Sequence, residues 1–152
     1  MRIVVTEFVS LDGVMEDVRF SLARLYPERR LEFRVQDGLA AACAEDDLGE
    51  MIGNLADNAC KWAARTVRIS ARRSEARVLV QVDDDGPGLT DKQREEVLAR
   101  GKRLDESMPG HGLGLSIAAK LATLHGGALT LRRSELRGLA AILDLPAAAT
   151  SL

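Results

Sequence analysis

The chain has 152 residues, a formal net charge of −2, 46% hydrophobic residues and only 3% aromatic residues. This length suits one domain whose core is built from aliphatic side chains and alanine. The near balance of charges argues against nucleic-acid binding, which normally appears as a clustered basic excess. No apolar run reaches the roughly 18 to 20 residues of a membrane-spanning helix, and the N-terminus lacks the pattern of a secretory signal. We therefore expect a soluble cytoplasmic domain that contacts neither nucleic acid nor a membrane.

The two cysteines, Cys43 and Cys60, lack the spacing of a metal site. Isolated cysteines are typical of proteins in a reducing compartment, where disulfides do not persist. We interpret both as small buried side chains.

The first half of the chain alternates short extended segments with two helices. Apolar residues recur at helical spacing after Asp12, and Pro27 closes that segment. This apolar face consists of Val14, Val18, Leu22 and Leu25. Carboxylates at Glu45 to Asp47 suit the positive end of a second helix. The predicted elements are an extended segment at Val9–Leu11, a helix over Asp12–Leu25, a strand at Leu31–Val35, an apolar segment at Leu39–Ala44 and a helix over Leu48–Ala64.

The second half mixes strands, helices and glycine-bearing loops. Thr90 and Gln93 form a capping-box pair that begins a short helix. The predicted elements are strands at Thr66–Arg72 and Arg77–Val82, a loop at Asp83–Gly88, a helix to Arg100, a loop at Gly101–Gly112, a helix over Leu113–Leu124 and a hairpin of Ala128–Arg133 with Leu139–Leu145. Because the elements do not alternate as regular βαβ units, the fold class is α+β, with one sheet and helices on one of its faces. We expect the domain to span residues 9–146, between an extension at 1–8 and a tail at 147–152.

One side of the helix over Leu48–Ala64 carries an unusual set of polar residues. At about 100° per residue, Glu50, Asn54, Asn58 and Lys61 all project on one side, opposite Leu48, Ile52, Leu55 and Ala59. A solvated helix face would explain the period alone, but asparagine is a poor residue for a helix interior. Amide oxygens can ligate Mg²⁺, and a lysine can bind phosphate. The residue types therefore leave two interpretations open, a solvated surface and a phosphate–Mg²⁺ site.

Two glycine-rich segments follow this helix. Asp84-Asp-Gly-Pro-Gly88 comes after a strand, and its first carboxylate can accept a hydrogen bond from an exocyclic amine, although such a segment alone is usually an ordinary acidic turn. Gly110-His-Gly-Leu-Gly-Leu115 precedes a helix, where backbone N–H groups can bind phosphate. This second signal is weak alone, and the missing strand before it disfavours a dinucleotide-binding Rossmann fold.

The order of these motifs resembles the catalytic domains of sensor histidine kinases, within the superfamily shared with gyrase B, Hsp90 and MutL. The matching motifs are Glu50-x3-Asn54-x3-Asn58-Ala-x-Lys61-Trp62, Asp84-x-Gly86-x-Gly88 and Gly110-x-Gly112-x-Gly114-Leu115. The resemblance covers roughly Val9 to Leu145 and implies a Bergerat-type ATP-binding fold: a two-layer sandwich of a mixed, largely antiparallel sheet with helices on one face. The amino-acid sequence around these motifs is similar to that of PhoQ-type kinases, which implies an inner-membrane sensor as the parent protein.

The resemblance also implies a role for each matching residue. Asn54 would coordinate the Mg²⁺ that bridges the ATP phosphates, and Glu50 would polarise the acceptor or a metal-bound water. Asn58 and Lys61 would contact the phosphates, and Trp62 would lie against the adenine or ribose. The glycine-rich motifs would supply the remaining ATP contacts: Asp84 at the adenine amine, Gly86 and Gly88 in the base pocket, and Gly110, Gly112, Leu113, Gly114 and Leu115 in or beside the lid.

The segment between the glycine loops carries Arg100, Lys102 and Arg103. These residues are either a solvated basic run or a part of the lid that neutralises charge on the γ-phosphate. Leu98 stands where many relatives have phenylalanine, so we expect it to anchor the lid. His111 and His125 are expected to have no chemical role.

The resemblance implies a protein-histidine kinase that lacks its own acceptor, because neither histidine lies on a helical hairpin before the catalytic domain. We expect the chain to bind Mg²⁺–ATP and to transfer the γ-phosphoryl group to a histidine on the dimerisation or phosphoacceptor domain of the parent kinase, with a response regulator downstream. Two alternatives stay open: an ATP-binding regulatory module without transfer activity, and an ATPase of the gyrase or Hsp90 type.

Overall fold

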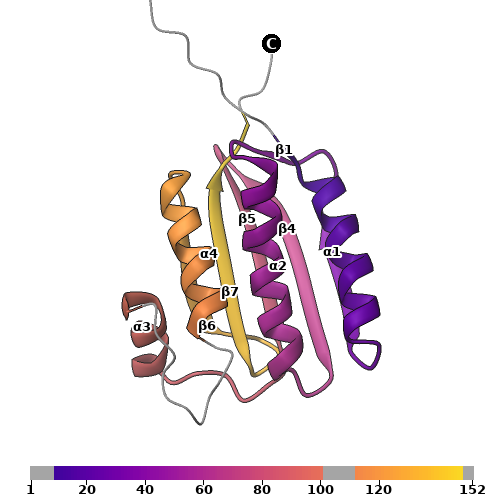
Figure 1. The fold of residues 1–152 in the computed structure, drawn as a ribbon, viewed down its shortest axis with the longest axis vertical. Helices are drawn as coiled ribbons and strands as arrows, with labels where there is room; N and C mark the ends of the chain where they lie inside the picture. Colours follow the sequence, from indigo (N-terminus) through magenta and orange to yellow (C-terminus); the bar gives the residue numbers. More distant parts are fainter. Residues whose placement is uncertain (1–8, 101–111, 149–152) are drawn as a thin grey trace, which may run out of the picture.

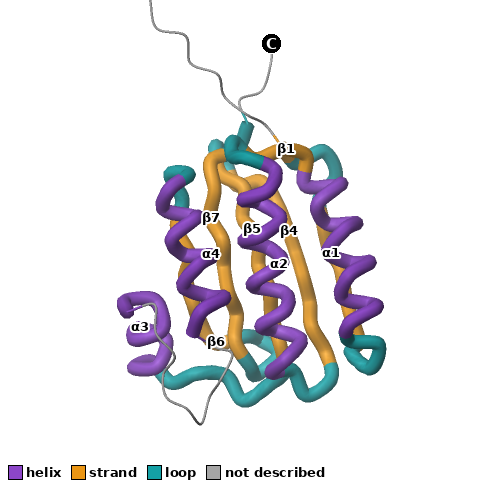
Figure 2. Tube along the Cα trace, viewed as in Figure 1, coloured by secondary structure: helices purple, strands orange, loops and turns teal. Residues whose placement is uncertain are grey.

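The computed structural model describes residues 9–100 and 112–148, and within them the chain forms two layers (Figures 1 and 2). One layer is a sheet, and α1, α2 and α4 cover one of its faces. The helices are α1 (Leu11–Leu25), α2 (Glu45–Trp62), α3 (Asp91–Arg100) and α4 (Gly112–Leu124). The strands are β1 (Val9–Ser10), β2 (Arg30–Val35), β3 (Ala40–Ala41), β4 (Thr66–Ser74), β5 (Arg77–Asp84), β6 (Ala128–Arg133) and β7 (Leu139–Pro146).

The main sheet has five strands in the order β2-β4-β5-β7-β6. β2 pairs with β4 in parallel, and every other neighbouring pair in this sheet is antiparallel. β1 and β3 form a separate antiparallel pair, and an isolated bridge joins Ala41 to Ala147. The predicted α+β class, with a mixed and largely antiparallel sheet covered by helices on one face, is therefore confirmed.

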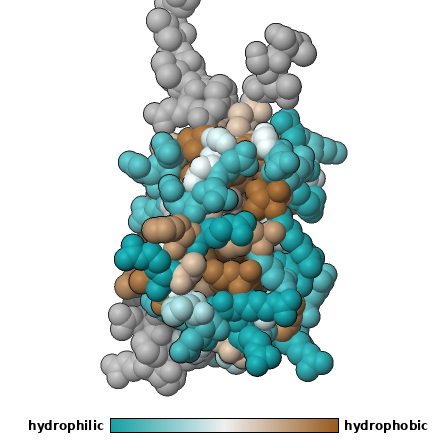
Figure 3. All heavy atoms as spheres, turned by 90° about the vertical axis from the view of Figure 1, so that its right-hand side faces the viewer, coloured by the Kyte–Doolittle hydropathy of each residue, from teal (hydrophilic) through white to brown (hydrophobic). Residues whose placement is uncertain are grey.

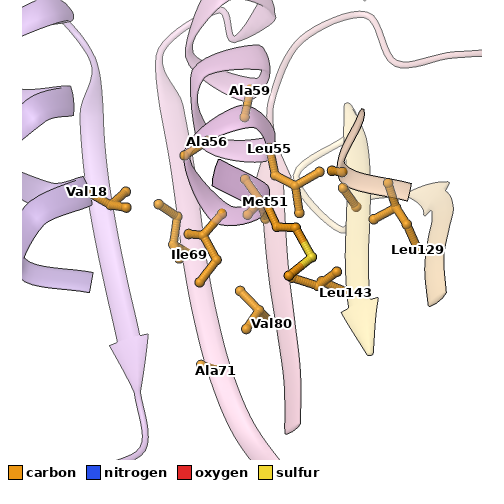
Figure 4. Packing of buried hydrophobic residues seen from close by; sticks show 14 of the residues in the cluster. Val18, Met51, Leu55, Ala56, Ala59, Ile69, Ala71, Val80, Leu129 and Leu143 are labelled. Carbon is orange, nitrogen blue, oxygen red and sulfur yellow. The ribbon is translucent and has the colours of Figure 1, made fainter. Parts of the chain in front are cut away.

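The core lies between α2 and the centre of the sheet (Figure 4). Alternate residues of β5 point toward the helices, so Val78, Val80 and Val82 are buried. Met51 and Leu55 of α2 are buried against this surface. Alternation along the strands and the helical period of α2 thus bury one face of each element.

The ends of the helices follow local sequence signals. The Ser10 hydroxyl accepts a hydrogen bond from Asp12 N at 3.3 Å at the start of α1. The predicted capping box is present, since Gln93 N donates to Thr90 Oγ1 at 3.1 Å and Thr90 N donates to Gln93 Oε1 at 2.9 Å. None of the helices that the structure describes is long and apolar enough to cross a membrane. Cys43 and Cys60 are both buried, as expected, and neither forms a disulfide within the described part of the chain.

Two local predictions are wrong. Asp83 and Asp84 were expected in a loop, but they are the last residues of the central strand β5 and are 5% and 2% exposed. Pairing continues this far because polar groups satisfy both carboxylates, as when the Ser134 hydroxyl donates to Asp83 Oδ1 at 2.7 Å. Leu25 was expected on the buried face of α1, but it is 68% exposed because it lies in the last turn. Figure 3 shows the side that carries α1, where apolar patches lie among hydrophilic residues.

Candidate functional site

A cavity of about 320 Å³, which we call the α2–α4 pocket, lies between these two helices. Its volume is at the lower end of the roughly 300–1,000 Å³ of small-molecule sites. Its lining comprises Asn54, Asp57, Asn58 and Lys61 of α2 and Leu113, Gly114 and Ile117 of α4. The structure thus brings together five residues that the sequence motifs had singled out, and it adds Asp57 and Ile117.

The two asparagines present polar atoms that the described part of the chain does not satisfy. Asn58 is 4% exposed. Asn58 Oδ1 and Asn54 Nδ2 are buried, and neither has a hydrogen-bond partner among the described residues. Leaving a buried polar group unpaired costs about 1–3 kcal/mol, and such groups are uncommon in native proteins. A ligand that accepts a hydrogen bond from Asn54 Nδ2, together with a group that donates one to Asn58 Oδ1, would remove this cost.

Lys61 supplies positive charge at the rim of the pocket, and Asp57 holds it. Lys61 Nζ lies 3.1 Å from Asp57 Oδ2, one helical turn earlier on α2. The other oxygen of Asp57 accepts a hydrogen bond of 2.5 Å from the hydroxyl of Tyr26, at the end of α1. Burial and this contact with Asp57 raise the pKa of the Tyr26 phenol, so the hydroxyl remains a donor at neutral pH. The sequence analysis had assigned no role to Asp57 or to Tyr26.

The first turn of α4 packs directly on α2. A Cβ built on Gly114 would lie 3.7 Å from Asn54 O and 3.8 Å from Asn54 Cβ, which is ordinary contact distance. The first N–H groups of a helix have no intrahelical acceptor and carry partial positive charge. Leu115, one residue later, is fully buried in the core and fixes this turn. The pocket therefore combines amide groups, a lysine and a helix N-terminus, which together favour an anionic ligand.

The Asp84 carboxylate is held rigidly at the end of β5. Its Oδ1 accepts hydrogen bonds from Gly86 N at 2.9 Å and from Leu139 N at 3.2 Å. Its backbone oxygen accepts a third from Gly138 N at 3.0 Å. Burial raises the pKa of this carboxyl, and the two backbone donors on Oδ1 oppose that rise. The result is a buried acceptor with a fixed orientation.

Two glycines make this arrangement possible. A Cβ on Gly86 would lie 2.2 Å from the carbonyl oxygen of Trp62, so the loop runs directly against the last residue of α2. A Cβ on Gly138 would lie 2.0 Å from Asp84 Oδ1. Gly88 adopts φ +70, which favours glycine. The sequence analysis did not predict a role for Gly138, because a single glycine in a predicted hairpin turn is not part of any recognisable motif.

Other residues that the sequence analysis discussed lie outside the α2–α4 pocket or outside the described residues. Glu50 is exposed on α2, one turn before Asn54, and does not line the α2–α4 pocket. Leu98 is partly buried against the core. Gly112 begins α4. His125 Nε2 lies 2.6 Å from Asp47 Oδ2 and ties the end of α4 to the start of α2. Lys102, Arg103, Gly110, His111 and the side chain of Arg100 lie outside the described residues.

Comparison with known proteins extends this picture. The family model described as histidine kinase-, DNA gyrase B-, and HSP90-like ATPase matches residues 43–149. The sensor protein kinase CarS of Pseudomonas aeruginosa is 48% identical over 120 residues, which is 79% of this chain and 27% of CarS. The sensor protein PhoQ of Escherichia coli K12 is 30% identical over 127 residues, which is 82% of this chain and 26% of PhoQ. The chain spans about a quarter of the length of these relatives.

Solved structures have the same fold. The mycobacterial sensor histidine kinase MprB superposes with a TM-score of 0.83 at 27% identity, covering 96% of this chain and 100% of that one. The ATP-binding domain of PrrB from Mycobacterium tuberculosis gives a TM-score of 0.80 at 28% identity, covering 95% of this chain and 98% of that one. The resemblance to sensor histidine kinases that the motifs indicated is confirmed.

Proposed function

Because the chain belongs to the family of histidine kinase-, DNA gyrase B- and HSP90-like ATPases, we propose that it binds Mg²⁺–ATP in the α2–α4 pocket as the catalytic domain of a sensor histidine kinase. One observation carries this proposal. Asn54, Asn58 and Lys61 line the same cavity as the first turn of α4, and buried amide atoms of both asparagines lack partners among the described residues.

The pocket fits a magnesium-bound triphosphate. Asn54 would hold the metal through its amide oxygen, since neutral oxygen ligands suit Mg²⁺ when phosphates supply the negative charge. The Nδ2 of Asn54, which has no partner among the described residues, would donate to a phosphate oxygen. Asn58 would contact a phosphate oxygen through its amide nitrogen, because its Oδ1 can only accept a hydrogen bond. Lys61 would contact another phosphate oxygen, and the N–H groups at the start of α4 would donate to others. When bound, Mg²⁺ neutralises charge on the phosphates. The chain's own contribution is to position the triphosphate between two packed helices.

Asp84 would select the base. The two backbone donors that orient this carboxylate both end on Oδ1, so Oδ2 is the oxygen that would accept a hydrogen bond from the exocyclic amine of adenine. Gly86 and Gly88 would line the base site, where the absence of side chains lets the backbone approach a flat ring. Trp62, whose carbonyl lies against Gly86, would border the adenine or ribose.

The γ-phosphoryl group would pass to a histidine outside this chain. Glu50 is exposed one turn from Asn54, so it is accessible to an incoming phosphoacceptor domain and would orient the acceptor. Arg100, Lys102 and Arg103 would neutralise the transferring group from the lid. The partners are then the dimerisation domain of the parent kinase and a response regulator downstream, and the domain would act in the cytoplasm, where ATP is available.

A transfer assay tests this function. The chain is mixed with the separate dimerisation hairpin of its parent kinase and ATP labelled at the γ-phosphate, with the Asn54→Ala variant as the control. We expect acid-labile label on the hairpin histidine with the unaltered chain and loss of label with the variant. Nucleotide binding without transfer would indicate a regulatory module, and release of free phosphate without the hairpin would indicate an ATPase.

A further inference from the structure

Asp57 stands in the wall between two cavities. It lines the α2–α4 pocket, and it also lines a groove of about 370 Å³ between α1 and α2. Both of its oxygens are engaged: Oδ1 accepts from the Tyr26 hydroxyl at 2.5 Å, and Oδ2 lies 3.1 Å from Lys61 Nζ. Asp57 therefore joins the end of α1 to the charged group at the rim of the proposed phosphate site.

Stability alone does not explain this arrangement. The side chains of Lys61 and Asp57 are 50% and 41% exposed, and ion pairs exposed to this degree contribute little to folding. A carboxylate beside a triphosphate site also opposes the negative charge of the ligand. What Asp57 does provide is geometry, because an unrestrained lysine ammonium on its flexible four-carbon stem samples many positions.

Tyr26 fixes the carboxylate from a rigid corner of the fold. Its N–H donates to Leu22 O at 2.8 Å at the end of α1, and its ring is packed against the core. The same corner is tied to α2 a second time, since Arg29 Nε donates to Cys60 O at 2.8 Å. The position of the Tyr26 hydroxyl relative to α2 is thus supported, independently of Asp57, by the packing of its ring and by the contact of Arg29 with Cys60.

We propose that Tyr26 and Asp57 are positioning residues of the nucleotide site: the Tyr26 hydroxyl orients Asp57, and Asp57 holds the Lys61 ammonium where the phosphates bind. This inference rests on the proposed function. It makes the corner between α1 and β2 part of the ATP site, although that corner lines neither the α2–α4 pocket nor the Asp84 loop.

A double-mutant cycle tests the inference. Affinity for Mg²⁺–ATP is measured by calorimetry for the unaltered chain, Tyr26→Phe, Lys61→Met and the double variant. Tyr26→Phe keeps the ring and removes only the hydroxyl, and we expect it to weaken binding about three- to tenfold. Because Tyr26 acts through Lys61, the double variant should bind no more weakly than Lys61→Met. If Tyr26 had only a structural role, Tyr26→Phe would weaken ATP binding by the same factor in the unaltered chain and in Lys61→Met.

Arg29→Gln is the matched control. It removes the other contact of the same corner but does not touch Asp57, so it should lower stability and leave ATP affinity within about twofold. A second measurement follows the ammonium signal of Lys61 by NMR in the ATP-free chain. We expect Tyr26→Phe, confirmed as folded by its circular dichroism, to broaden this signal through faster exchange with water, and Arg29→Gln to leave it unchanged.

The outcomes separate this inference from the proposed function. If the unaltered chain binds no Mg²⁺–ATP, both fail together. If it binds and Lys61→Met weakens binding, but Tyr26→Phe matches the unaltered chain or adds fully to Lys61→Met, only the positioning roles of Tyr26 and Asp57 are overturned.

Discussion

Gly138 is the position at which one added methyl group should damage the site most. A Cβ built there lies 2.0 Å from Asp84 Oδ1, 2.4 Å from Asp84 O and 2.7 Å from Gly86 N, and all three distances are below the 3.0 Å that real Cβ atoms keep. The backbone of Gly138 is not among the glycines with positive φ, so alanine is conformationally allowed. The expected effect of Gly138→Ala therefore comes from the clash alone.

The magnitude follows from what the clash displaces. Moving the hairpin turn away from Asp84 strains two hydrogen bonds, Gly138 N to Asp84 O at 3.0 Å and Leu139 N to Asp84 Oδ1 at 3.2 Å. Overpacking costs about 1–3 kcal/mol, and a weakened hydrogen bond to a charged acceptor costs about 1.5–3 kcal/mol. Since relaxation relieves one penalty at the expense of the other, we expect a loss of about 3 kcal/mol.

Urea denaturation of Gly138→Ala measures this loss, and Gly49→Ala is the control. Gly49 lies in the interior of α2, and a Cβ there meets nothing within 4 Å. That substitution should raise the free energy of unfolding by about 0.5–1 kcal/mol, the ordinary advantage of alanine over glycine in a helix. ATP affinity should fall only for Gly138→Ala, because Asp84 moves. A free energy of unfolding for Gly138→Ala within about 0.5 kcal/mol of the unaltered chain would refute the reasoning.

Three further predictions concern single groups. Burial raises the pKa of Asp84 above its ordinary 3.8, so the stability of the ATP-free chain should fall as pH rises from that value through the folded-state pKa. Asp84→Asn should abolish this fall in stability, measured by urea titrations at each pH, and should weaken the binding of ATP. If the affinities for ATP and for GTP are unchanged by the substitution, Asp84 does not recognise adenine. Burial likewise raises the pKa of Cys60 from 9.0 to about 11, so the stability of the chain should decline between these pH values. Cys60→Ala should flatten this decline. An identical pH profile of stability in that variant would exclude the thiol as the cause. Asn54→Ala should make ATP affinity insensitive to Mg²⁺ in calorimetry with and without a chelator, and a persisting Mg²⁺ dependence would exclude Asn54 as the metal ligand.

The regular elements could be predicted because each carries its own local signal. The alternation of Val67 and Ile69 with Arg68 and Ser70 identified β4, and the Thr90 capping box identified the start of α3. Asp84 was placed wrongly in a loop because one of the two backbone groups that satisfy its side chain, Leu139 N, comes from a segment 55 residues away in the sequence. No local pattern reports such a partner.

In the candidate site, too, the features with a local sequence signal were predicted and the contacts between distant segments were not. The helical period placed Asn54, Asn58 and Lys61 on one side of α2, and the structure assembles them in one pocket. The period left open whether Asn58 lies on a solvated surface, and the structure shows that it is almost fully buried beside α4. Contacts between separate elements could not be predicted from the sequence. One of them is the hydrogen bond from the Tyr26 hydroxyl to Asp57, whose two residues are 31 positions apart.

The central claim is that Mg²⁺–ATP binds between α2 and α4, and an NMR titration of the isotope-labelled chain tests it most directly. The side-chain amide signals of Asn54 and Asn58 should shift on adding Mg²⁺–ATP, together with the backbone amides of Gly86 and Gly114. Residues on the open face of the sheet, such as Ser70, should not shift. Saturable shifts confined to that open face, or no shifts at millimolar Mg²⁺–ATP, would contradict the account.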